Sequence, residues 1–426
     1  MDPMTTPHRG RPRSPVAQLA LPVYVPSLIW STGSGALTSV MVLAALALGL
    51  TESQASLVAA CSGLAGVLTG PWVGRWVTRA GDRAAFVVGT ALAVVSLGAA
   101  LVTLPHPGVP WAQALYVAAI VALSISANIW SLARQSYVAE SVPMSWRARA
   151  LSMLGGMLRM GQVFGPGLGS VALALWSYPG AFWLQIAMTV IALGFVLAFV
   201  LPSPERLEEA AGAPSSAPTP VPAPPAREHA DGRATALLAV GVILLTVVRA
   251  NRMVIVPLWG HQLGISDHLI ALTFSASAVL DAAVFYPVGR VTDARGRRWA
   301  LIPTMLIMGA GFVGMAAWQT TAGFVVCACL IGLGNGFGAG IVMTLGADLS
   351  PDVERSRFLG LWQSIQQAGM TAGPFLVSAM VAAFGVASSA WATGALSLFG
   401  VVWFLAAVPH AYARLGMDDR GRPLPH

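Results

Sequence analysis

Twelve long apolar runs, separated by short charged loops, most constrain how this chain of 426 residues can fold. Each run holds roughly 20 residues or more, which is the length a helix needs to cross the hydrocarbon core of a bilayer. The runs are continuously apolar, so they favour helices over a membrane barrel. They lie near 20–48, 53–75, 84–104, 112–139, 149–175, 179–201, 234–259, 268–289, 299–318, 321–347, 357–383 and 388–409.

Composition narrows the functional classes. Charged residues make up only 10% of the chain and hydrophobic residues 56%, which excludes a water-soluble domain. All 24 basic residues are arginine, and they are scattered between apolar runs, so no nucleic-acid partner is expected. Paired catalytic carboxylates, a phosphate-binding loop and zinc-ligand spacing are missing from the sequence. The sequence therefore predicts no enzyme, no cofactor and no metal site.

The arginines also predict the orientation in the membrane. Arginines of the N-tail, of alternate loops and of the C-tail fall on one side, and the loops of the other side carry none. Because arginine is held on the cytoplasmic side of short loops, both termini are expected in the cytoplasm. Ala, Arg and Gly richness suggests the cytoplasmic membrane of a high-GC bacterium. The expected units are an N-tail 1–19, a bundle 20–202, a Pro- and Ala-rich linker 203–232, a bundle 233–409 and a C-tail 410–426.

The two predicted bundles carry an internal repeat. Residues 139–170 align without a gap with residues 347–378, and ten of the 32 positions are identical. The identical positions include Gly165-Pro166 and Gly373-Pro374. The stretch GRVTDARGRR at 289–298 has a degraded copy, GRWVTRAGDR, at 74–83. We expect two parallel copies of one six-helix unit.

With these motifs the chain resembles the major facilitator superfamily, in particular its drug/proton antiporters. The resemblance rests on the loop 289–298 and on Gly161-x-x-x-Gly165-Pro166-x-x-Gly169. It implies an all-α integral membrane protein of twelve helices, arranged as two pseudo-symmetric six-helix bundles around a central cavity. It also implies alternating access, in which the bundles rock around that cavity, and a monomer in the lipid bilayer.

The resemblance further implies a conformational latch, in which Asp293 meets the start of the fifth helix only while the cytoplasmic side is closed. A solvated loop that merely sets topology is the alternative. The latch set comprises Gly289, Asp293, Gly296, Arg297, Arg298, Gly74, Gly81, Arg83, Arg147 and Arg149. On the fifth helix, Gly161, Gly165 and Gly169 share one face, and Pro166 removes a backbone hydrogen bond. This face is either a plain packing seam or an element of exchange transport.

Charged residues inside the apolar runs are functional candidates because burying them in a membrane is costly. Asp281 is the acid well inside a run, about 12 Å from the cytoplasmic end, and Arg159 lies about 15 Å from that end. The resemblance places the fifth and eighth helices side by side. An Arg159–Asp281 pair is therefore predicted, either as a proton-sensitive tie between the halves or as a static ion pair.

Further polar and aromatic residues inside the runs are candidates to line the cavity. Arg249 and Arg252 share a helix face and are expected to bind an anionic group or to snorkel to the outer headgroups; for Arg134, snorkelling is favoured. The full cavity set is Arg249, Arg252, Asn251, Arg134, Trp30, Tyr24, Trp130, Asn128, Gln135, Asn335, Trp362 and Gln366. Each aromatic or amide residue could instead be packing or an interfacial anchor.

Two transport functions follow. The first is proton-coupled efflux, by antiport, of amphiphilic drug-like or lipid-like compounds, with the proton gradient as driving force. The alternative is a symporter or facilitator of a small anionic metabolite, suggested by the excess of intramembrane arginine over acid.

Overall fold

The computed structural model describes residues 18–142, 144–200, 230–338, 340–351, 355–418 and 420–422. Side chains at 139, 144–148, 152, 285, 286, 289, 293 and 355–357 lie outside this description. The predicted N-tail 1–19 and linker 203–232 fall almost wholly outside the described residues, so these boundaries stay predictions.

The regular structure of the described residues is helical, and it divides into two halves joined through the linker. The first half comprises the π-helix η1 (Ala20–Tyr24), α2 (Val25–Ala47), α3 (Glu52–Ala80), α4 (Asp82–Thr103), α5 (Pro110–Ser141) and α6 (Met144–Phe199). The second comprises α8 (Gly232–Gln262), α9 (Asp267–Arg295), α10 (Arg298–Ala317), α11 (Thr321–Phe337), α12 (Ile341–Leu349), α13 (Arg355–Phe384) and α14 (Val386–Arg414). The predicted all-α architecture is confirmed.

Two helical segments depart from one helix per apolar run. α6 covers two runs, and its backbone turns sharply at Trp176 and at Ser177, which has a φ of 53°. The run 321–347 was expected to be one helix. It is interrupted between α11 and α12, where Gly340 adopts the left-handed conformation. That correction matters because helix ends inside a membrane protein expose backbone dipoles that can face a cavity.

Local sequence signals fix several helix ends. Thr51 caps α3 in a capping box, with its Oγ1 accepting from Gln54 N and its N donating to Gln54 Oε1. Gly81 and Gly296 end α3 and α9 with φ angles of 81° and 107°, which glycine adopts without strain. These glycines occupy the same place in the two copies of the charged loop, so each loop reverses the chain in the same way.

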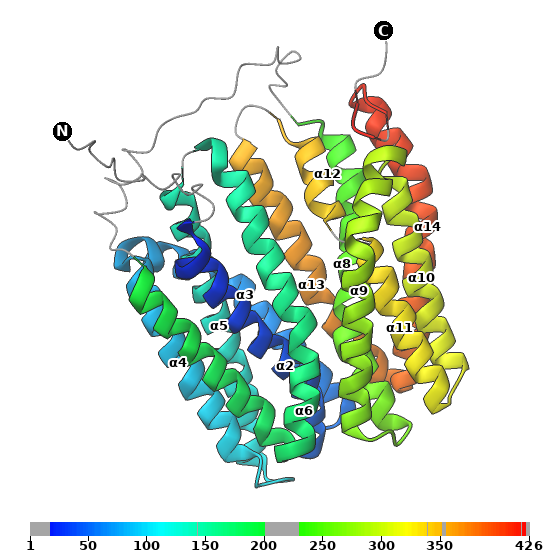
Figure 1. The fold of residues 1–426 in the computed structure, drawn as a ribbon. Helices are drawn as coiled ribbons and strands as arrows, with labels where there is room; N and C mark the ends of the chain where they lie inside the picture. The colour runs from blue at the N-terminus through cyan, green and yellow to red at the C-terminus, as the bar shows by residue number, and fades with distance from the viewer. Residues whose placement is uncertain are drawn as a thin grey trace, which may run out of the picture.

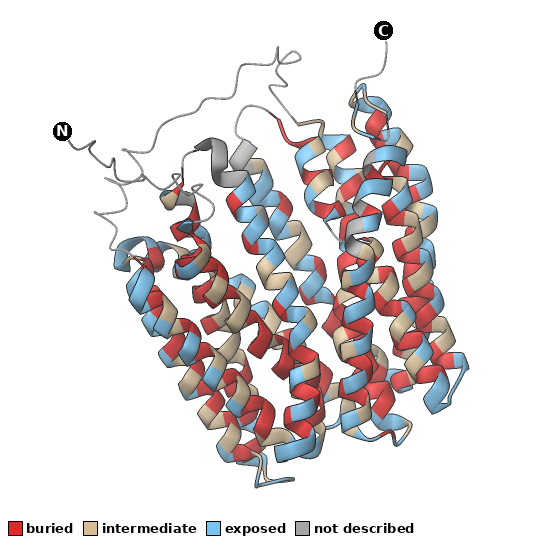
Figure 2. Ribbon diagram, in the orientation of Figure 1, coloured by how far each residue is buried: buried red, intermediate tan, exposed pale blue. Residues whose placement is uncertain are grey.

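The outer surface is suited to lipid. Eleven helical segments of the described residues are long and apolar enough to cross a membrane, with the two runs of α6 counted together. Large apolar side chains such as Val95, Leu175 and Val402 are exposed. Figure 2 shows buried and exposed residues alternating around the helices, as expected when one side packs inward and the other contacts lipid. The chain is a multi-pass membrane protein.

The two ends of the bundle differ in charge. One end carries the helix ends and turns with Arg79, Arg83, Arg295 and Arg297 and the end of α14, and we call it the arginine-rich face. The other end carries the turns after α2, α4, α8 and α10 and the Trp176–Ser177 turn, and we call it the opposite face. Most helices run between these two faces (Figure 1).

The halves pack together most closely at the opposite face. One apolar cluster runs through the second half and also contains Leu43, Leu48 and Phe182, which lie near the opposite face of the first half. A second cluster, with Phe86 and Trp130, belongs to the first half alone. Figure 1 shows α6 and α9 close together toward the opposite face and diverging toward the arginine-rich face.

Polar contacts join the halves at the same face. Ser53 Oγ donates to Ser378 O at 3.1 Å, and Ser378 Oγ donates to Ser53 O at 3.0 Å. His268 Nδ1 lies 3.2 Å from Ser170 O, and the Tyr178 hydroxyl donates to Asp267. The structure is thus closed at the opposite face.

Candidate substrate and coupling site

A cavity of about 210 Å³ lies between the two halves. Its lining comes from α2 and α6 of the first half and from α8, α9 and α11 of the second. The lining residues are Gly35, Thr38, Arg159, Gln162, Val163, Pro166, Arg252, Met253, Phe274, Ala278, Asp281 and Asn335. The cavity is therefore lined by both halves.

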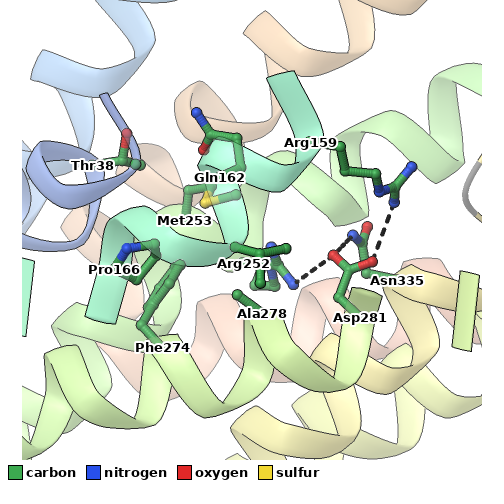
Figure 3. Close-up of a pocket in the computed structure, with 12 residues that line it drawn as sticks. Thr38, Arg159, Gln162, Pro166, Arg252, Met253, Phe274, Ala278, Asp281 and Asn335 are labelled. Atoms are coloured by element: carbon green, nitrogen blue, oxygen red, sulfur yellow. Dashed lines mark hydrogen bonds and ion pairs between the residues drawn. The ribbon is translucent and has the colours of Figure 1, made fainter. Parts of the chain in front are cut away.

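Asp281 is the centre of the polar network in this cavity (Figure 3). Arg159 Nη2 lies 3.2 Å from Asp281 Oδ1, and Arg252 Nη1 lies 3.7 Å from Asp281 Oδ2. Asn335 Nδ2 donates to Asp281 Oδ2 at 2.5 Å. The structure brings Arg159 and Asp281 together, as their matched depth predicted. Their role in coupling stays a prediction.

Close helix packing places Asn335 beside Asp281. Gly332 and Gly336 of α11 face α9, and side chains at these positions would collide with Ser277 and with the backbone of Asp281. Ser277 Oγ also donates to Ala328 O at 2.9 Å. Small residues four apart let two membrane helices approach closely. Within the glycine-rich stretch 334–338, Gly336 and Gly338 therefore pack against Asp281 and Arg249.

Arg252 and Arg249 point into the protein. The Arg252 side chain is only 8% exposed, and its guanidinium lies 5.8 Å from the centre of the Phe274 ring. Arg249 Nε and Nη2 are buried without a hydrogen-bond partner among the described residues. Arg249 passes Gly338, where a side chain would collide with its guanidinium. The snorkelling alternative is therefore wrong for Arg252, whose charge faces Asp281.

The sequence profile of the Major Facilitator Superfamily matches residues 27–248 and 238–424. The chain belongs to the Major Facilitator Superfamily. This is a family of membrane transporters and not of enzymes, so the predicted resemblance is confirmed.

Two relatives show what this superfamily member is similar to. A protein of Deinococcus radiodurans, described as a sugar efflux transporter, is 29% identical over 188 residues, covering 42% of this chain and 45% of the relative. An uncharacterised superfamily transporter of Bacillus subtilis is 26% identical over 137 residues, covering 32% of this chain and 34% of the relative. The chain spans less than half the length of these curated relatives in either match.

Solved structures confirm the superfamily fold. A D-xylose–proton symporter superposes with a TM-score of 0.69 at 16% identity, covering 96% of this chain and 100% of that one. A POT family transporter in complex with 5-aminolevulinic acid superposes with a TM-score of 0.71 at 10% identity, covering 95% of this chain and 98% of that one. At such low identity the likeness concerns the fold alone.

Several predicted cavity residues of the first half instead form a packed cluster within it. Trp30 stacks on Trp130 with ring centroids 6.1 Å apart, and the Arg134 guanidinium lies 4.7 Å from the Trp30 ring centre. Arg134 is 3% exposed, so the predicted snorkelling is wrong. Outside this stack, Tyr24 donates to Ala150 O, Asn128 to Gly66 O and Gln135 to Ser131 Oγ. These residues do not belong to the described lining of the central cavity.

Of the predicted cavity residues of the second half, some line the cavity and others pack elsewhere. Asn251 pairs with Thr393 at 2.8 Å and joins α8 to α14. Trp362 donates to Val342 O at 2.8 Å and is buried, while Gln366 is half-buried on α13. Arg252 and Asn335 are the members of the predicted set that line the described cavity. Sequence reasoning missed Thr38, Gln162 and Phe274, which carry no charge that would draw attention inside a run.

The glycine face of α6 packs against α2. Side chains at Gly161, Gly165 and Gly169 would come within 2.6, 2.5 and 2.6 Å of α2 atoms. The contacts of these three glycines are therefore those of a packing seam between α6 and α2. Pro166 lies beside that face, on the cavity, and the non-helical angles of α6 occur at Trp176 and Ser177.

The predicted latch is described only in part. Gly289 lies within α9, but the side chains of Asp293 and Arg147 lie outside the described residues, so the latch itself stays a prediction. Two loop arginines brace their own halves: Arg83 Nη2 donates to Leu197 O at 3.1 Å, and Arg297 Nε pairs with Asp348 Oδ2 at 2.9 Å. Gly74 lies within α3, Arg149 is exposed and Arg298 is half-exposed.

Proposed function

We propose that the chain is a proton-coupled secondary transporter that works by alternating access, and that Asp281 binds the coupling proton. The supporting observation is the contact of Asp281 with Arg159 across the two halves, inside a cavity that both halves line. A carboxylate that bridges moving units can change their affinity for one another when it gains a proton. With the arginine-rich face in the cytoplasm of a bacterium, the closed face is the outer one.

The charge change gives the direction of this effect. As a carboxylate, Asp281 attracts Arg159 of the first half and Arg252 of its own half. As a neutral acid it keeps hydrogen-bonding capacity but loses that attraction. Protonation therefore loosens the tie between α6 and α9 at the depth of the cavity. A static ion pair would hold the same geometry without responding to the proton gradient.

For the substrate, we propose first a small anionic solute that moves together with a proton. A volume of about 210 Å³ is below the roughly 300–1,000 Å³ of pockets that take drug-sized ligands. Of the described residues around the cavity, more carry a guanidinium group than a carboxylate, which disfavours cations. Efflux of an amphiphile by proton exchange is the second candidate, and the similarity to a protein described as a sugar efflux transporter supports only its outward direction.

The test uses the full chain, as a monomer, in liposomes. Uptake of labelled gluconate, glucose and the dye ethidium is measured with and without an imposed pH gradient. We expect gradient-driven accumulation of at least one probe by the native chain and its loss in Asp281→Asn, while exchange of that probe continues. Asp418→Asn, in the exposed C-terminal turn, is the matched control. Accumulation by Asp281→Asn at the native level would overturn the assignment of the proton to Asp281.

A further inference from the structure

Three guanidinium groups share the neighbourhood of one carboxylate. Arg159 and Arg252 pair with Asp281, and Arg249 lies within electrostatic range of all three. Among the described residues around the cavity, guanidinium groups therefore outnumber carboxylates. Arginine keeps its charge at any pH that proteins experience, so this surplus is not relieved by losing protons. Buried charges of this kind are costly unless something of opposite sign meets them.

The two arginines of α8 have hydrogen-bond donors to spare. Arg252 Nη1 and Arg249 Nε and Nη2 are buried without a hydrogen-bond partner among the described residues. Arg249 and Arg252 are three positions apart and so share a face of α8. Arg252 is more than nine-tenths buried and lines the cavity itself. Buried donors left unpaired lower stability, which favours a ligand that accepts hydrogen bonds here.

We infer that Arg249 and Arg252 form a binding site for the anionic group, a carboxylate or a phosphate, of the transported solute. Planar guanidinium groups hold such groups through paired, charge-assisted hydrogen bonds. The Phe274 ring lies against Arg252, and the Arg249 guanidinium packs closely against Gly338, so both side chains are held in place by contacts that accept none of their hydrogen bonds. This inference rests on the proposed transport function and names the chemistry of its substrate.

The same arginines couple the anion to the proton. The groups that face Asp281 are Arg159 from α6, Arg249 and Arg252 from α8 and Asn335 from α11. A charged Asp281 competes with a solute anion for Arg252 and Arg159, and the two negative groups repel each other. A protonated Asp281 releases those donors to the anion. Proton and anion therefore strengthen each other's binding, and by linkage the effect is reciprocal.

Binding of gluconate, glucose and inorganic phosphate to the purified full chain in lipid nanodiscs tests the site. Gluconate and glucose share a six-carbon polyol frame but differ in charge, and phosphate tests whether the charge alone suffices. We expect gluconate to bind at least tenfold more tightly than glucose. We also expect gluconate to bind more tightly at about pH 5.5 than at about pH 7.5, although its own carboxylate is ionised at both pH values. Arg249→Gln and Arg252→Gln should each weaken gluconate binding at least tenfold.

Matched variants keep the result interpretable. Arg79→Gln removes the same charge from the exposed end of α3 and should bind gluconate like the native chain. Arg252→Lys keeps the positive charge but loses the paired donors of the planar guanidinium, so we expect an intermediate affinity for gluconate. This variant replaces Arg252→Gln if the latter does not fold. Asp281→Asn should bind gluconate tightly at both pH values, because its neutral amide leaves the arginines available.

The outcomes separate this inference from the proposed function. Equal binding of gluconate, phosphate and glucose, or native affinity in both glutamine variants, would overturn the anion site while leaving the loss of coupling in Asp281→Asn intact. Conversely, tight gluconate binding that depends on Arg249 and Arg252, together with native proton coupling in Asp281→Asn, would support the anion site and overturn the assignment of the proton to Asp281.

Discussion

At the scale of single residues, Asp348 shows how one carboxylate can hold three helices. It accepts from Arg297 Nε at 2.9 Å and from the Tyr412 hydroxyl at 2.6 Å, joining α10, α12 and α14. Burial acts to lower the pKa of Arg297, but its hydrogen bond and attraction to Asp348 raise that pKa above its usual value. Arg297 therefore stays charged at any pH that a cell experiences.

Removing that carboxylate should be costly. In Asp348→Ala, the Arg297 side chain, 10% exposed, and the Tyr412 hydroxyl lose their common acceptor. We expect a loss of about 2–3 kcal/mol, because breaking a largely buried pair leaves an uncompensated charge. Thermal unfolding in detergent measures the change, with Asp418→Ala as the control at an exposed turn. A midpoint equal to that of the control variant would show that Asp348 does not stabilise this contact.

At the scale of residues, the sequence predicts contacts best where charged side chains are rare, as they are inside the apolar runs. Asp281 and Arg159 could be paired in advance because charges inside apolar runs are few and their depths can be counted. For Arg252 the sequence left two alternatives, an anion site and snorkelling to the outer headgroups, because the direction of a long side chain does not follow from its position in a run; in the structure it reaches toward Asp281. Asp348 was overlooked, although it aligns with Glu140 in the repeat, because it lies at the end of a run where acids are common.

At the scale of elements, the glycine face of α6 sets how closely α2 can approach. A Cβ at Gly165 would lie 2.5 Å from Thr32 O, so Gly165→Ala forces the two backbones apart. Overpacking of this kind costs about 1–3 kcal/mol. Gly155→Ala on the same helix, where a Cβ meets open space, is the matched control. Thermal unfolding of both variants should show a lower midpoint for Gly165→Ala alone, and equal midpoints would contradict the seam.

The start of α8 should be sensitive to acid. Asp231 caps the helix by accepting from Ala234 N at 2.8 Å, and it also pairs with Arg414. These two interactions, the backbone hydrogen bond first, lower the pKa of Asp231. A lowered pKa in the folded state means that the cap is fully present above about pH 4, the usual Asp value, and is lost as the pH falls through the folded value.

Hydrogen exchange in the first turn of α8 measures this loss. After correction for intrinsic rates, protection of the Ala234 amide should fall as the pH drops below about 4. Asp231→Asn keeps a capping oxygen but does not titrate, so its protection should not change over the same range. If protection of the Ala234 amide changed with pH in the same way in the native chain and in Asp231→Asn, the acid sensitivity would not come from Asp231.

The helices themselves could be predicted because continuous apolar runs allow little else in a bilayer. The interruption between α11 and α12 could not, because glycines occur within membrane helices as well as at their ends. Gly334 and Gly336 lie inside α11, whereas Gly340 precedes α12 in the left-handed conformation. Tertiary contacts, here the packing of α11 against α9 and of Gly338 against Arg249, decide between these outcomes.

At the scale of the whole molecule, the repeat predicted two similar halves but not how they meet. The first half has one apolar cluster of its own, while a second cluster runs through the second half and reaches the first at the opposite face, where the serine pair of Ser53 and Ser378 also joins the halves. Two units that meet mainly at one face can adopt more than one arrangement at similar free energy. A single sequence therefore specifies the halves more strongly than it specifies which face is closed.

A disulfide across the closed face tests whether the halves must separate there during transport. Ser53 Oγ and Ser378 Oγ are 3.2 Å apart, close enough for cysteines at these positions to form a bond. In a background without Cys61, Cys327 and Cys329, oxidised Ser53→Cys/Ser378→Cys should lose transport, because the opposite face cannot open. A reductant should restore transport, and each single-cysteine variant should be insensitive to oxidation. The contrary outcome is that the cross-linked protein still carries its solute across the liposome membrane at the native rate. The halves would then not need to separate at this face, and the proposal that they rock to give alternating access would be wrong.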